Sequence, residues 1–244
     1  MAKIHGVGIG SIAPAQDIYE EKSTQLHRLG SKLILGERIF QYCGAAAVAL
    51  APGKMVQSSA PIPNHTNVTV SAAVAIDGKV VTPTMGATAV TANQYADGYM
   101  HVNDVTGEGQ CYRVKSHPAA DSGATCAFTL YDALEAALDA TSQVTLVANP
   151  YKEVIIAPNA ALTAPARGVP LIDVTASYYF WLQTAGPAPV LVQGTVVIGQ
   201  PVGLGGTADG ACGPIAAFTT DVWGRVMQVN ASTEYALIDL RLDS

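Results

Sequence analysis

Residues 178–184 read Tyr-Tyr-Phe-Trp-Leu-Gln-Thr, the densest run of aromatic side chains in a chain that contains only 7% aromatics. Such residues favour β-strands, and Gly186 and Pro187 then separate the run from an apolar segment at 190–192. Because side chains alternate across a strand, four consecutive aromatic residues place two rings on each face. We therefore expect a central strand that is buried on both faces or turns one face toward a neighbouring subunit. The candidate core or interface residues are Tyr178, Tyr179, Phe180, Trp181 and Trp223.

Much of the remaining chain consists of short segments rich in Val, Thr and Ala, separated by turns. The 23 glycines and 14 prolines mark those turns. Asp77-Gly78 lies between Val-Ala-Ile at 74–76 and Lys-Val-Val at 79–81, and this dipeptide favours the type I′ turn of a β-hairpin. The pattern predicts a mainly β protein with two small β-barrel or sandwich-like modules, an extended N-terminal arm and at most one short helix.

One segment, residues 129–138, has a helical pattern. Leu130, Leu134 and Leu138 recur at every fourth position, and the alanines among them favour a helix. The same run is also compatible with an irregular crossover between strands.

The expected domain organisation begins with an arm over residues 1–30, where a glycine-rich start is followed by a polar stretch with a short amphipathic helix around residues 18–26. The first β module then covers residues 31–160 and the second covers residues 161–244. An Ala- and Pro-rich stretch at 158–169 is the expected link between them.

The charge content limits the kind of partner. Only 13% of residues are charged, about half the usual quarter, which suits a protein that buries much of its surface against its own copies or a lattice. The net charge of −6 and the absence of a Lys/Arg run argue against nucleic acid as a partner. No apolar run approaches the ~20 residues of a membrane helix, and the N-terminus lacks the apolar core of a signal peptide, so we expect no membrane association.

The motifs that suggest chemistry are weak. Residues 8–13 match the dinucleotide-binding pattern G-x-G-x-x-A, but too few residues precede them to form the required strand, and Pro14 disturbs the helix that should follow. The four cysteines contain no C-x-x-C pair, so we expect buried thiols rather than a metal or redox site; they are Cys43, Cys111, Cys126 and Cys212.

His101 and Asp104 place an imidazole near a carboxylate in sequence. On a strand these two positions face opposite sides, and the other histidines have no metal-ligand spacing. No G-x-S-x-G elbow is present. We therefore expect no catalytic residue, no metal and no cofactor. A hydrolase that uses Asp/His pairs would need a pocket with convergent polar side chains of perturbed pKa.

Several segments, in one order along the chain, resemble structural proteins of tailed-phage virions, and in particular capsid decoration (cement) proteins. They begin with Gly-Glu-Arg-Ile-Phe-Gln-Tyr and end with a strand-rich C-terminal segment; they lie at residues 36–42, 44–45, 50–57, 144–146, 149–151, 179–184, 186–187 and 224–240.

The resemblance implies a β-rich, non-enzymatic protein that binds the outer face of the phage head, often as a trimer, with the major capsid protein as its partner. It implies a location on the outer capsid surface of the virion, after synthesis in the host cytoplasm. The arm is then expected to bridge subunits, so deleting residues 1–29 should abolish head binding without affecting folding. The alternative is a carbohydrate-binding fibre or receptor-recognition module that uses the aromatic residues 178–181.

Overall fold

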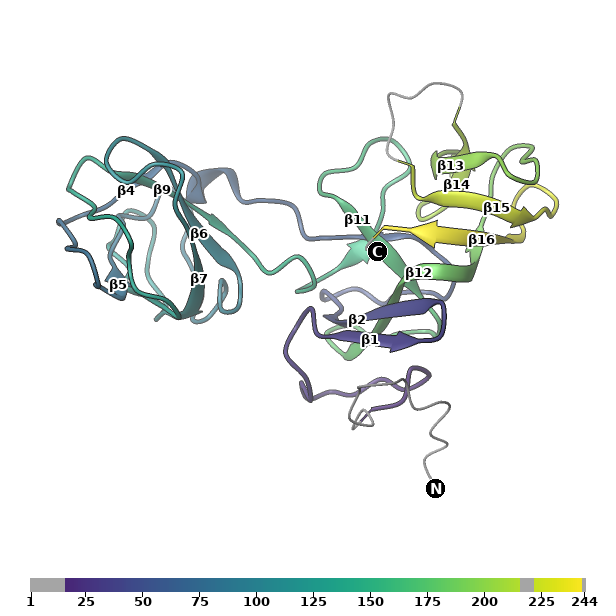
Figure 1. Ribbon diagram of the computed structural model, residues 1–244, viewed down its shortest axis with the longest axis horizontal. Helices are drawn as coiled ribbons and strands as arrows, with labels where there is room; N and C mark the ends of the chain where they lie inside the picture. The colour runs from purple at the N-terminus through teal and green to yellow at the C-terminus, as the bar shows by residue number, and fades with distance from the viewer. Residues whose placement is uncertain (1–15, 216–221, 243–244) are drawn as a thin grey trace. The chain divides into compact units, whose positions relative to one another are not determined.

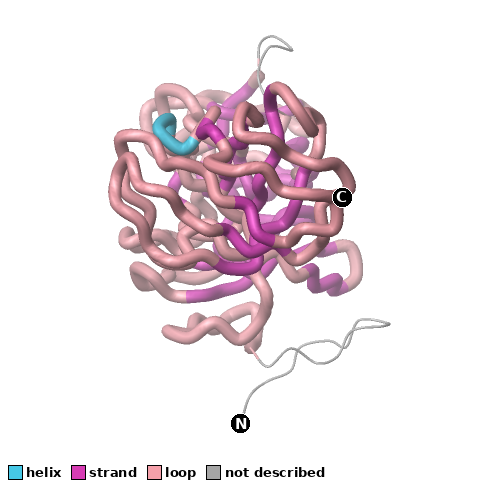
Figure 2. Tube along the Cα trace, turned by 90° about the vertical axis from the view of Figure 1, so that its left-hand side faces the viewer, coloured by secondary structure: helices cyan, strands magenta, loops and turns pink. Residues whose placement is uncertain are grey.

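The computed structural model describes residues 16–215 and 222–242, and within them the expectation of a mainly β protein is confirmed. The chain forms two compact units, each described by itself below. Unit 1 contains Met1–Ala60 and Pro150–Ser244, and unit 2 contains Pro61–Asn149. Each is built on a curled antiparallel sheet (Figure 1). The only helix in the described residues is the single 3-10 turn Pro63–His65, drawn in cyan in Figure 2. No described helix is long and apolar enough to span a bilayer.

The sheet of unit 1 has ten strands. Eight run in the order β10-β3-β11-β12-β16-β15-β13-β14, while β1 pairs with β2 and β2 pairs with β12. Their bounds are β1 (Lys32–Leu35), β2 (Arg38–Gly44), β3 (Val56–Gln57), β10 (Ile155–Ile156), β11 (Ala166–Pro170), β12 (Tyr179–Leu191), β13 (Pro201–Leu204), β14 (Cys212–Pro214), β15 (Gly224–Gln228) and β16 (Tyr235–Arg241).

Strand β12 is thirteen residues long and is the centre of this sheet. Its first half pairs with β2, placing Trp181 opposite Tyr42, and its second half pairs with β16, placing Ala188 opposite Ile238. The two halves contribute to two separate hydrophobic clusters, because Phe180 packs in one and residues such as Ala188 pack in the other. The expected aromatic strand is therefore present and links the two cores of unit 1.

The register of β12 against β2 shifts at a bulge, and the buried side chain of Gln183 holds the backbone there. Its Nε2 donates to the carbonyl oxygens of Ala185, Gly186 and Pro187 at 3.1, 3.3 and 2.9 Å. Its Oε1 accepts hydrogen bonds from Nε and Nη2 of Arg38 at 3.3 and 3.0 Å. One side-chain amide thus bonds to three backbone carbonyl groups beside the bulge and fixes the backbone there.

The described part of the arm packs against unit 1 and forms no helix. Ile18 and Leu29 are buried in the cluster that also contains Phe180. Lys22 pairs with Tyr179 through two backbone hydrogen bonds of 2.9 and 2.8 Å. The helix expected around residues 18–26 is therefore wrong, because this backbone pairs with a strand instead. The glycine motif at 8–13 lies outside the described residues.

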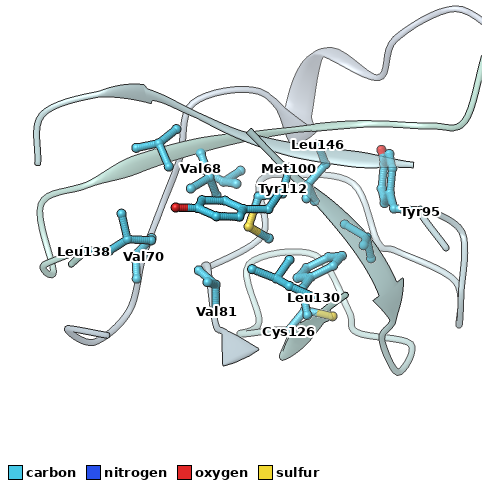
Figure 3. Close-up of a cluster of buried hydrophobic side chains, with 14 of the residues drawn as sticks. Val68, Val70, Val81, Tyr95, Met100, Tyr112, Cys126, Leu130, Leu138 and Leu146 are labelled. Atoms are coloured by element: carbon cyan, nitrogen blue, oxygen red, sulfur yellow. The ribbon is translucent and has the colours of Figure 1, made fainter. Parts of the chain in front are cut away.

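Unit 2 is a six-stranded sheet in the order β4-β9-β6-β7-β8-β5. Backbone hydrogen bonds from Ser71 to Thr82 and from Thr84 to Thr69 connect the segments at its two edges, so the sheet curls back on itself. It encloses its own apolar core, which includes Met100, Tyr112 and Leu146 (Figure 3). The bounds are β4 (Val68–Thr69), β5 (Val80–Val81), β6 (Tyr99–Asp104), β7 (Cys111–Ser116), β8 (Phe128–Leu130) and β9 (Gln143–Val147).

The helix expected over residues 129–138 is absent. Residues up to Leu130 belong to β8, and the backbone N–H groups of Leu134 and Leu138 donate to the carbonyl oxygens of Gly78 and Val74. All three leucines are buried in the core of unit 2. Even spacing also suits the two-residue period of extended chain, so the same leucine pattern serves a segment that follows the sheet.

The hairpin expected at Asp77-Gly78 is also absent, although a turn forms there. Val74 pairs with Leu138, and Val80–Val81 pairs with β8 rather than with residues 74–76. Asp77 has a φ of 70°, whereas Gly78 does not adopt a positive φ, so the type I′ geometry is not reached. Long-range pairing has overridden the local turn preference.

The observed units do not follow the expected division at residues 160/161. Unit 2 is inserted into unit 1, and the Ala- and Pro-rich stretch expected as a linker lies within unit 1 and contains the start of β11. The insertion leaves and re-enters unit 1 at one place: Gln57 of β3 pairs with Ile155 of β10, and Ser58 Oγ donates to the Pro150 carbonyl at 2.8 Å.

Unit 2 should be removable, because adjacent ends and a separate core are the properties that make domain insertions tolerated. We expect a chain in which residues 61–149 are replaced by a short Gly/Ser linker to retain the β-sheet circular dichroism spectrum and cooperative melting of unit 1. The isolated fragment 61–149 should also melt cooperatively. A linker variant that fails to fold would show that unit 1 needs unit 2.

Gln183→Leu should destabilise the protein by about 3 kcal/mol, because it leaves buried carbonyl groups and Arg38 without their hydrogen bonds. Urea unfolding monitored by tryptophan fluorescence measures the change. The matched control is Gln228→Leu, at an exposed position of β15, which should change the free energy of unfolding by less than about 0.5 kcal/mol. Equal effects of the two substitutions would contradict the role assigned to Gln183.

Candidate functional site

The predicted aromatic residues lie mainly in the core of unit 1. Phe180 and Trp223 are completely buried and Trp181 is 3% exposed, while Tyr178 and Tyr179 are partly buried against the same cluster as Phe180. Trp223 belongs to the other cluster of unit 1, so the five residues do not form one surface.

Hydrogen bonds of Gln16 hold the described part of the arm against Trp181. Its backbone carbonyl accepts the indole N–H of Trp181 at 3.0 Å, and its side-chain Oε1 accepts the hydroxyl of Tyr42 at 2.8 Å. Its Nε2 donates to the carbonyl oxygens of Glu20 and Tyr179 at 2.8 and 2.9 Å. The ring system is therefore covered and its polar atoms are satisfied, which leaves no platform on Trp181 for a ligand.

His27 extends this aromatic cluster. Its ring centroid lies 5.0 Å from that of Tyr42 and 5.2 Å from that of Trp181. Burial lowers the pKa of His27 below its ordinary value of 6.5, and its Nε2 is a buried atom without a hydrogen-bond partner among the described residues. Burial also raises the pKa of the Tyr42 hydroxyl. The cluster therefore favours uncharged side chains and is suited to packing rather than proton transfer.

Two histidines that are distant in sequence meet Tyr95 in the core of unit 2. Nδ1 of His65 lies 2.5 Å from the Tyr95 hydroxyl, and its Nε2 lies 3.0 Å from the Thr88 carbonyl, so Nε2 carries the proton. His117 Nε2 accepts the backbone N–H of Tyr95 at 3.0 Å. Sequence spacing gave no signal for this arrangement. All four ring nitrogens of His65 and His117 have hydrogen-bond partners within the fold. The cluster therefore stabilises the local structure and leaves no ring nitrogen free to bind a metal.

The other candidate residues are not brought together. The carboxylate of Asp104 accepts the N–H of its neighbour Val105 at 2.9 Å, and the described residues contain no cluster of three or more His, Cys, Asp or Glu side chains suited to a metal. All four cysteines are described and remain thiols, of which only Cys111 is exposed. Burial raises the pKa of Cys212 to about 12, which makes it a poor nucleophile.

Unit 2 also carries an open hollow of about 510 Å³. None of its lining side chains is acidic, basic or otherwise suited to acid–base chemistry; they are Pro63, Asn64, Thr66, Asn67, Val68, Thr69, Thr84 and Gly86. The hollow therefore provides neutral hydrogen-bonding groups but no catalytic constellation.

The described surface exposes many large hydrophobic side chains. Fifteen large hydrophobic side chains are substantially exposed, and six of them lie between residues 197 and 235, in β15 and β16 or in the loops next to β13, β15 and β16. Solvent-exposed apolar groups concentrated in one region are a feature of protein–protein contact sites. These loops are the strongest candidate for a functional surface.

Comparison with known proteins returned no matching family model, no similar curated protein and no similar solved structure.

The lowered pKa of His27 predicts an acid-sensitive fold. The unfolded chain takes up a proton at this position near pH 6.5, and the folded chain resists it, so the free energy of unfolding should fall as the pH drops below about 6.5. His27→Phe keeps a ring between Tyr42 and Trp181 but cannot titrate, so it should weaken this dependence. Urea unfolding between pH 5 and pH 8 makes the comparison, and parallel pH profiles for the two proteins would contradict it.

Proposed function

We propose that this chain is a non-enzymatic structural protein of a phage virion, which binds the outer surface of the head and stabilises the capsid lattice as a decoration or cement protein. Its partners are the major capsid protein and further copies of itself, arranged as a homotrimer. The chain is made in the host cytoplasm and resides on the outer capsid surface.

The observation that carries the proposal is where the segments resembling virion proteins lie in the fold. Residues 36–42 form the turn before β2 and most of that strand, residues 179–184 begin β12, and residues 224–240 form β15 and β16. These strands come from both ends of the sequence, yet β2 pairs with β12, β12 with β16 and β16 with β15. Residues 144–146 lie in β9 of unit 2, but these three segments make up one connected part of unit 1, which supports a shared module rather than scattered chance matches.

The surface chemistry also supports this role. Only 13% of the residues are charged, and many large apolar side chains are exposed. Such a surface is better suited to a protein in permanent contact with other proteins than to a monomer. A protein that binds only the assembled lattice stabilises that lattice by mass action. Several copies joined in a ring add avidity, because each bound copy raises the effective concentration of the next.

The alternative, a carbohydrate-binding fibre or receptor module, placed a sugar on the aromatic residues 178–181. Stacking requires an accessible ring face, and Trp181 is covered by the segment that Gln16 anchors. The exposed large hydrophobic side chains of the C-terminal region lie in other segments, from Val197 to Tyr235. We therefore favour the head-binding function.

Head binding is tested by cosedimentation of the purified chain with expanded heads that lack their own decoration protein. The full chain should pellet with the heads at saturating stoichiometry. A chain lacking residues 1–15 should bind at least about tenfold more weakly and melt at the same temperature, if the arm bridges subunits. A full chain that stays in the supernatant at all concentrations would contradict the proposed function.

The cut at residue 15 replaces the deletion of residues 1–29 that the sequence suggested. Gln16, Ile18 and Leu29 are buried parts of unit 1, so the longer deletion would remove core side chains and damage folding. Loss of binding by that variant would say nothing about the arm. The matched control is Gln16→Ala, which keeps residues 1–15. It removes the side-chain hydrogen bonds of Gln16 with Tyr42 and with the backbone of Glu20 and Tyr179. This variant should melt at a lower temperature than the unaltered chain and still bind heads.

A further inference from the structure

We infer that one end of unit 1, formed by residues 193–200 and 226–233, is the surface through which copies of this chain associate with one another. We call this surface the apolar end. The inference deepens the proposed function, on which it rests for the expectation of a ring of copies, and it assigns that contact to particular residues.

The apolar end contains no charged residue. Neither residues 193–200 nor residues 226–233 include Asp, Glu, Lys or Arg. Four large hydrophobic side chains are exposed there, and Ile198, at 66%, is the most exposed large hydrophobic side chain among the described residues; the four are Val197, Ile198, Met227 and Val229. The centres of protein interfaces are depleted of charge and enriched in such side chains, Met included.

A tight turn presents Ile198 in a fixed position. The N–H of Gln200 donates to the carbonyl of Val197 at 3.0 Å, and Gly199 has a φ of 81°. A positive φ at the third residue of the turn is the type II pattern, which glycine adopts without strain. Position 198 is the second residue of such a turn, where proline is favoured. Because the Ile198 side chain is mostly exposed, it contributes little buried apolar area to the stability of the fold.

The two segments of the apolar end are held together by hydrogen bonds. Gly199 N–H donates to the carbonyl of Val226 at 2.8 Å, and Arg225 Nη1 donates to the carbonyl of Gly199 at 3.0 Å. At the other side, Gly194 N–H donates to Ser232 Oγ at 3.1 Å. In Figure 1 the β15–β16 connection, in yellow, lies beside the green loop that precedes β13. A surface that is already ordered loses little conformational entropy on binding.

Charge distribution favours a second copy as the occupant. Each chain carries a net charge of −6, so the repulsion between two copies is smallest where they meet at a surface free of acidic groups. The apolar end is such a surface. The charged residues that flank it in the sequence, Arg225 and Glu234, are both exposed and carry opposite charges. In a head-to-tail ring the rim of one copy presents Arg225 to Glu234 of the next, which gives the contact a defined direction.

Sedimentation velocity of the full chain in the absence of heads tests this inference. The unaltered chain should sediment as a trimer at about 50 μM, and Ile198→Glu should weaken association at least tenfold, because it buries an unpaired charge in the contact. The matched control is Ile76→Glu, which changes a side chain that is 57% exposed in unit 2 and should leave the trimer intact. Circular dichroism establishes that both variants fold.

A charge exchange tests the direction of the contact. Arg225→Glu should weaken the trimer more than Arg225→Gln, because both lose the hydrogen bond to Gly199 but only the glutamate repels Glu234 of the next copy. The double variant Arg225→Glu with Glu234→Arg should recover association at least to the level of Arg225→Gln, since the rim charges are then exchanged. Failure of the double variant to recover, with both proteins folded, would overturn the proposed pairing of the rims.

The remaining outcomes separate this inference from the proposed function. An unaltered chain that is monomeric at 50 μM, or an Ile198→Glu chain that remains trimeric, overturns the apolar end as the self-association surface. If the Ile198→Glu trimer persists but no longer binds heads, the surface faces the shell, and the inference fails while the proposed function stands. If Ile198→Glu separates the copies while the unaltered trimer ignores heads, the inference stands and the proposed function fails.

Discussion

Unit 1 depends on a single bent strand. The thirteen residues of β12 pair with β2 over the first half and with β16 over the second, and the strand contributes to two hydrophobic clusters. Beside the register shift between those halves, the backbone carbonyls of Ala185, Gly186 and Pro187 face the buried side chain of Gln183, where an unpaired polar group would cost several kcal/mol in an apolar medium. Gln183 meets that constraint with its own amide. Segments from both ends of the sequence then complete the sheet around β12.

The same strand explains how the other parts are attached. The arm from Gln16 onward closes over Trp181 and Tyr179 at the beginning of β12. The second half of β12 pairs with β16, whose connection to β15 forms part of the apolar end. Unit 2 is inserted between β3 and β10, two paired strands, and keeps a core of its own. Unit 1 thus combines an anchored arm, an inserted unit and an exposed apolar surface.

Sequence reasoning predicted those features that depend on local pattern. The aromatic run at 178–184 predicted a central strand, and the glycine and proline content predicted a β-rich fold. It failed where distant pairing decides the outcome: Leu134 and Leu138 bond to Gly78 and Val74, and Ile155 returns to Gln57 across the whole of unit 2. The apolar end was also missed, because exposure of Ile198 depends on the turn that carries it and not on hydrophobicity.

The proposed function assigns these features to one task, in which a rigid β scaffold binds a shell and joins its own copies through a surface without charge. The most direct measurement is a cryo-electron microscopy map of heads saturated with the purified chain. The account predicts density for unit 1 on the outer face of the shell, with the loops at 193–200 and 226–233 in contact with a neighbouring copy. Heads without added density, or isolated copies whose apolar ends face solvent, would contradict it.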